Sequence, residues 1–106
     1  MRQGRLFEDL PRPAAAEAVE AIARGRDLRI ERIVSRGHRS PEGFWYDQDE
    51  AEWVVLLRGA ARLALASGRT IDLGPGDWIH LEAHERHRVE WTDPERDTVW
   101  LAVFHR

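Results

Sequence analysis

The chain has 106 residues, which is enough for one domain with its own core and too few for a second. Its net charge is −3 at pH 7 with acidic and basic residues interspersed, and it has no cysteine, so we expect no nucleic-acid surface, no disulfide and no thiolate ligand. No apolar run approaches the roughly 20 residues that cross a bilayer, and residues 1–9 lack the apolar stretch of a secretory signal, so we expect a cytoplasmic protein without membrane contacts.

The first element that the sequence predicts is a short N-terminal helix, from about residue 13 to residue 24. Pro13 suits the first position of a helix because it has no N–H to leave unpaired, and Gly25 suits the position after the last turn. Small apolar residues recur between them at helical spacing: Ala15, Ala18, Val19, Ile22 and Ala23. The helix is short and weakly apolar, so we expect residues 1–27 to form a lead and a helix that packs against the remaining domain.

From Leu28 onward the pattern of apolar residues changes from helical to alternating, which is typical of β-strands. Many short strands with closely spaced turns predict an all-β barrel, and we assign residues 28–106 to this single domain. The last strand is apolar on both faces, so we expect the barrel core to cover one face and the helix or a partner subunit to cover the other. The predicted strands are 28–35, 44–47, 52–58, 60–66, 69–73, 77–81, 86–91 and 98–104.

The segment from Gly43 to Gly59 resembles the first of the two motifs of the cupin superfamily. That motif carries His-x-His, then Glu, and ends on Gly. Glu52 and Gly59 match its end. With three residues between the second histidine and Glu, Gln48 and Tyr46 stand where the two histidines are usually found, and with four residues Asp47 and Trp45 do.

The segment from Gly74 to His87 resembles the second cupin motif, with Glu82 in place of its proline and His84 in place of a glycine. Together the motifs resemble those of small, single-domain, RmlC-like cupins, over about residues 28–106. The resemblance implies a jelly-roll barrel, here with a short N-terminal helix outside it, and a homodimer that binds a small molecule.

A candidate metal or ligand site follows from the alternation of these strands. Glu52 begins one apolar strand, and His87 shares a face of its strand with Trp91. If both faces point into the barrel, Glu52 and His87 meet there, and Gln48 can join them as a third donor. Carboxylate, amide and imidazole suit Fe(II), Mn(II), Ni(II) or Zn(II), although more loosely than three imidazoles would. The alternative is that Glu52 and His87 pair with each other and hold no metal.

Three further residues are candidates near this site. Tyr46 is either an orienting hydroxyl or general acid, or a half-buried aromatic residue. His84 is predicted at the rim, where it can touch a ligand. Alternation places Arg32 on an apolar face, where an inward guanidinium needs a carboxylate of the protein or of a ligand. The alternatives for Arg32 are a bulge that exposes it, or a salt bridge to Glu52 or Glu82.

Three functions therefore remain open. The first is a metal-dependent enzyme acting on a small molecule, such as an oxygenase or an isomerase. The second is a module that binds a small polar ligand without a metal. The third is a metal-independent enzyme similar to the sugar-nucleotide epimerases of the superfamily, in which a histidine and a tyrosine perform acid–base chemistry. No phosphate-binding glycine loop or serine nucleophile elbow is present to suggest another class.

Overall fold

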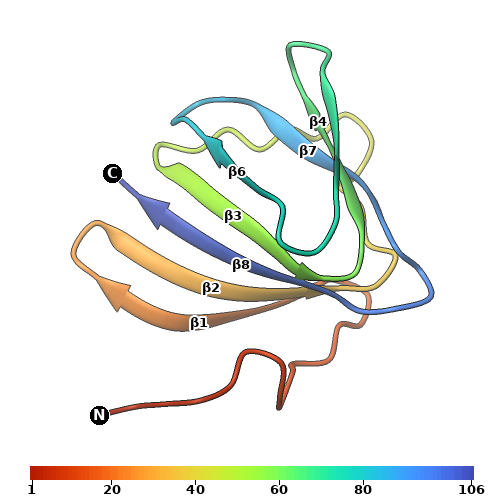
Figure 1. Ribbon diagram of the computed structural model, residues 1–106. Coiled ribbons are helices and arrows are strands. Elements are labelled where there is room, and N and C mark those ends of the chain that lie inside the picture. The colour runs from red at the N-terminus through yellow and green to blue at the C-terminus, as the bar shows by residue number, and fades with distance from the viewer.

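The computed structural model describes residues 1–106 and is built entirely from strands and their connections (Figure 1). The strands are β1 (Ala18–Gly25), β2 (Leu28–Ser35), β3 (Ala51–Arg58), β4 (Ala61–Leu65), β5 (Thr70–Leu73), β6 (Trp78–Leu81), β7 (His87–Thr92) and β8 (Thr98–His105). They form a five-stranded sheet in the order β1-β2-β8-β3-β6 and a three-stranded sheet in the order β5-β4-β7. The predicted all-β fold is thereby confirmed. The protein has no helix long and apolar enough to cross a membrane.

The predicted N-terminal helix is wrong, because residues 18–25 form strand β1. This strand pairs antiparallel with β2, and its register shifts between Ala21 and Ala23. The shift breaks strict alternation, which is why the segment showed no clear strand pattern. Asp27, at φ 58°, closes the turn between β1 and β2. Pairing with β2 gives these residues backbone hydrogen bonds along one edge of the strand, whereas a short, weakly apolar helix is unstable by itself.

Residues 1–9 run alongside β1, outside the five-stranded sheet (Figure 1), and Arg32 holds them there. The Arg32 side chain is 6% exposed, and its guanidinium donates a hydrogen bond of 2.6 Å to Glu20 on β1. It also donates to the backbone carbonyls of Arg5, Leu6, Glu8 and Asp9 at 3.0–3.3 Å. Arg32 therefore faces away from the barrel interior. Both the predicted inward position and the predicted partners Glu52 and Glu82 are wrong, since Glu20 supplies the carboxylate.

The hydrophobic core lies between the two sheets. On β8, Trp100 and Phe104 point into this core, while Leu101 and Val103 face the other side and are only partly buried. Removal of such apolar surface from water is the main stabilising contribution to a fold of this kind. The buried cluster comprises Val54, Leu56, Ala61, Leu63, Leu73, Trp100, Ala102 and Phe104.

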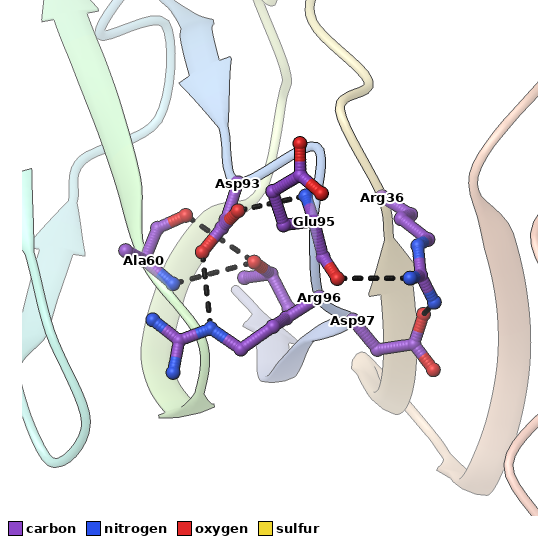
Figure 2. A network of polar contacts seen from close by, with 7 residues as sticks. Arg36, Ala60, Asp93, Glu95, Arg96 and Asp97 are labelled. Atoms are coloured by element: carbon purple, nitrogen blue, oxygen red, sulfur yellow. Dashed lines mark hydrogen bonds and ion pairs between the residues drawn. The ribbon is translucent and has the colours of Figure 1, made fainter.

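The turn between β7 and β8 is fixed by charged residues at one end of the barrel (Figure 2). The Asp93 carboxylate accepts hydrogen bonds from the backbone N–H of Glu95 at 2.8 Å and from Nε of Arg96 at 3.1 Å, and these bonds lower the pKa of Asp93. Arg36, just after β2, donates to the carbonyl of Glu95 at 2.8 Å and lies 3.6 Å from Asp97. The network joins the ends of β2 and β7 to the start of β8.

Candidate functional site

A pocket of about 260 Å³ lies between the two sheets, at the end where β3 and β7 begin. Its wall is mostly apolar, with a small number of polar side chains, as is usual for sites that bind small molecules. The polar lining residues are Glu17, Arg29, Glu31, Tyr46, Gln48, Glu52 and His87.

Glu52 and His87 face each other inside this pocket. Oε1 of Glu52 lies 3.6 Å from Nε2 of His87, and the two side chains are 11% and 9% exposed. Nδ1 of His87 lies 2.9 Å from the backbone carbonyl oxygen of Glu85. A carbonyl can only accept, so Nδ1 carries the proton, and Nε2 of the neutral ring has its lone pair toward Glu52 and the pocket. The predicted meeting of Glu52 and His87 is found in the structure.

Tyr46 and Gln48 reach the same pocket from the connection between β2 and β3. The backbone of Tyr46 forms an antiparallel bridge with His87 through two hydrogen bonds of 2.7 and 3.2 Å. The predicted strand 44–47 is absent apart from this bridge. The rings of Tyr46 and His87 stack with their centroids 5.2 Å apart. Nε2 of Gln48 lies 3.5 Å from Oε1 of Glu52. Four of the predicted site residues therefore share one pocket.

The pKa values of His87 and Tyr46 are both raised. For His87, burial acts in the lowering direction, but the interactions with the Glu52 carboxylate and the Glu85 carbonyl outweigh it and raise the pKa above about 6.5. For Tyr46, burial raises the pKa, and the charges of Glu17 and Glu52 raise it further. At neutral pH Tyr46 keeps its proton and can donate a hydrogen bond, while His87 readily accepts a proton on Nε2.

His84 lies at the rim, as predicted, but its side chain does not line the pocket. Its backbone has φ 62°, and its side chain is 62% exposed. Nδ1 lies 2.7 Å from the Asp47 carboxylate, and Nε2 lies 3.2 Å from Asp49. The hydrogen bond with Asp47 raises the pKa of His84. His84 acts on the site through its backbone, because its N–H donates to the carbonyl of Gln48 at 2.7 Å.

Trp91 does not share the inner face of His87, because β7 contains a bulge. Leu63 on β4 pairs with Val89, and the preceding Arg62 pairs with Trp91, so Glu90 is an extra residue on β7. The bulge turns Trp91 outward, where it is 43% exposed.

Sequence reasoning missed Arg29, Glu31 and Glu17. Alternation on β2 places Arg29 and Glu31 on the face opposite Arg32, the residue for which an inward position was one of the alternatives. In the structure Arg29 and Glu31 line the pocket, whereas Arg32 binds the backbone of residues 5–9 on the other face. The only available signal was that Arg29 and Glu31 are two residues apart and of opposite charge.

The site offers few metal ligands. No three His, Cys, Asp or Glu side chains in the structure come together so that they could hold a metal ion. Glu52 and His87 are two strong donors, and the Gln48 amide is a weak third, whereas a tight transition-metal site uses three or four strong ones. The residues present therefore do not fit a tightly held metal.

Comparison with known proteins agrees with this geometry. The sequence model of the family described as "Cupin domain" matches residues 33–104. The crystal structure of a candidate mannose-6-phosphate isomerase from Ralstonia eutropha JMP134 is 43% identical, with a TM-score of 0.94 over 99% of this chain and 98% of that one. An RmlC-like cupin protein from Desulfovibrio desulfuricans shares the fold at 15% identity, with a TM-score of 0.80 over 99% and 96% of the two chains.

Two curated relatives match a shorter stretch. The L-ectoine synthases of Rhodococcus opacus (strain B4) and Rhodococcus jostii (strain RHA1) are each 42% identical over 57 residues, or 53% of this chain. The match spans only 39% of the length of these relatives.

Proposed function

Because the chain belongs to the cupin family, we propose that it binds a small polar molecule between its two sheets and that His87 and Glu52 move a proton on that molecule. One observation carries this proposal: Nδ1 of the buried His87 is tied to a backbone carbonyl, so that Nε2 and Glu52 are left together in the pocket. An imidazole held in this way serves as a general base, and the neighbouring carboxylate stabilises the imidazolium that forms.

The roles of the other two predicted residues follow from their positions. Tyr46 stacks on His87 and keeps its proton at neutral pH, so it suits the role of hydrogen-bond donor or general acid toward a substrate oxygen. Gln48 lies beside Glu52 and orients that carboxylate. Isomerisation of a sugar or similar compound requires a base that takes a proton from one carbon and returns it to the next. The name of the similar Ralstonia protein points to the same reaction class.

The proposal is tested by measuring, with NMR and over a range of pH, the rate at which the protein converts small polar compounds, aldoses and ketoses included. His87 must be neutral to accept a proton, so the rate should rise with pH through the raised pKa of His87. Glu52→Gln removes the carboxylate while burial remains, so the pKa of His87 falls and this limb should move to lower pH. His87→Ala should lower kcat by about 100-fold or more.

Glu90→Gln is the matched control for Glu52→Gln. It also replaces a glutamate by glutamine, but Glu90 lies on β7 and does not line the pocket. We expect it to leave both kcat and the pH profile unchanged. Turnover that persists in His87→Ala, or a pH profile that does not move in Glu52→Gln, would contradict the proposal.

A second candidate is a loosely held divalent metal at Gln48, Glu52 and His87, which is favoured by the convergence of these three side chains in one pocket. We expect Fe(II), Mn(II), Ni(II) or Zn(II) to bind, and Glu52→Ala to weaken binding by about tenfold or more. Mass spectrometry of protein purified without a tag or chelator, followed by titration with each ion, measures this. The control is Asp49→Ala, at the rim of the pocket, which should bind each metal ion with the affinity of the parent protein. Equal metal affinity in Glu52→Ala would exclude this ligand set.

We also propose that a second copy of the chain covers the outer face of β8, β3 and β6. Trp53, Leu101 and Val103 are only partly buried there, and Trp78 is 59% exposed. An apolar sheet face of this kind is typical of an interface. Val103→Glu should convert a dimer into a monomer in analytical ultracentrifugation, while Thr70→Glu on β5 should not. A wild-type chain that is monomeric at high micromolar concentration would refute the dimer.

A further inference from the structure

The wall of the pocket carries more negative than positive charge. Glu17, Glu31 and Glu52 line it, and Arg29 is the one arginine among the lining residues. With His87 neutral, this leaves an excess of two negative charges, and protonation of His87 removes only one of them. Charges in a mostly apolar cavity act more strongly on one another and on a ligand than they would in water.

Arg29 already has two carboxylate partners, at Nε and at Nη1. Its Nε lies 2.9 Å from the Glu31 carboxylate, and its Nη1 lies 3.2 Å from that of Glu50. Its guanidinium carbon lies 4.2 Å from the centroid of the Phe104 ring. An anionic ligand that approached Nη2, the remaining nitrogen, would lie beside both carboxylates and be repelled by them. Arg29 also shows what this wall stabilises, namely a cation between carboxylates and over an aromatic face.

Glu17 and Glu52 each use one carboxylate oxygen within the chain. Oε2 of Glu17 accepts a hydrogen bond of 2.8 Å from the Ser35 hydroxyl, and Oε1 of Glu52 makes both contacts with Gln48 and His87. The second oxygen of each remains available to a donor. The charges of these same two carboxylates raise the pKa of Tyr46, so their field extends across the pocket.

We propose that the ligand of this pocket is a small polar compound that carries an ammonium or guanidinium group, received by Glu17 and Glu52 against the aromatic wall. This inference rests on the proposed function and narrows its substrate class. Phosphorylated and carboxylated compounds are then disfavoured. The sugar phosphate in the name of the Ralstonia protein is therefore not the substrate expected here.

The test uses methylguanidinium, acetate and inorganic phosphate as probes at equal ionic strength, with the wild-type protein as purified. The indole N–H of Trp100 and the imidazole of His87, both in residues that line the pocket, report binding in NMR spectra. Methylguanidinium should shift these signals saturably, and the two anions should not. Glu17→Gln should weaken methylguanidinium binding by about fivefold. Glu95→Gln, which makes the same change in the β7–β8 turn, should leave it unaltered.

Saturable shifts from phosphate or acetate, absence of a saturable shift from methylguanidinium, or undiminished binding in Glu17→Gln would each overturn the proposal. Anion binding that appears only on addition of Mn²⁺ would overturn it too, because the charge of the metal ion would then make the pocket select anions. Failure of this inference is distinguishable from failure of the proposed function. Glu17 lies outside the His87–Glu52 pair, and the proposed function fails on separate results, namely turnover that persists in His87→Ala or a pH profile that does not move in Glu52→Gln.

Discussion

Replacement of Gly59 by alanine is expected to lower the free energy of unfolding by about 3 kcal/mol or more. Gly59 has φ 97°, a region that residues with a side chain rarely adopt. A Cβ there would lie 2.5 Å from Oγ1 and 2.7 Å from Cα of Thr98, and 2.8 Å from the backbone oxygen of Asp97. Thr98 cannot move aside, because it is fully buried and its hydroxyl is hydrogen-bonded to the backbone of Ala60.

Gly68→Ala is the matched control for this substitution. Gly68 has φ 102°, but a Cβ there would meet no atom within 4 Å. Gly68→Ala should therefore lower the free energy of unfolding only by the backbone strain, about 1–2 kcal/mol. Urea unfolding followed by tryptophan fluorescence measures both variants, and unchanged m-values would show that the folded state is the same. Equal losses in the two variants would show that strain alone, without the contact to β8, explains the requirement for glycine at position 59.

The barrel and the centre of the site could be predicted because both depend on local pattern. Alternation and closely spaced glycine turns determine the strands from Leu28 onward, and Glu52 stands in register with the buried Val54 of the same strand. Gly59, which ends the first cupin motif, marks the close approach of β3 to β8. These signals are short-range, so the sequence alone contains them.

The errors concern residues whose environment is set by distant parts of the chain. Alternation leaves Arg32 facing inward, exposed at a bulge or paired with Glu52 or Glu82, but its partners are Glu20 and the backbone of residues 5–9. The bulge at Glu90 that turns Trp91 outward depends on pairing with β4 and leaves no mark in β7 itself. For β1, a short alanine-rich segment is compatible with helix or strand, and only the available edge of β2 decides between them.

Arg32→Met is expected to lower the free energy of unfolding by about 2–4 kcal/mol and to release residues 1–9 from the sheet. Methionine keeps most of the apolar length of the side chain, so the main loss is that of the guanidinium. The guanidinium donates five hydrogen bonds, four to backbone carbonyls and one to the Glu20 carboxylate. Without it, the carbonyls of residues 5–9 lose their common partner. The contacts that remain are exposed ones, such as the hydrogen bond from Arg2 to the carbonyl of Ile22 and the packing of Arg58 on the Phe7 ring.

Hydrogen exchange measures this release directly, because the amides of residues 1–9 and of β1 should exchange faster in Arg32→Met than in the parent. Arg62→Met is the control, since Arg62 is half exposed and makes a single ion pair with Asp72. It should change neither stability nor exchange measurably. The pocket lies on the opposite face of β2, so methylguanidinium should still shift the Trp100 indole signal in Arg32→Met. Loss of that signal together with the N-terminal segment would show that residues 1–9 shape the pocket as well as cover the sheet.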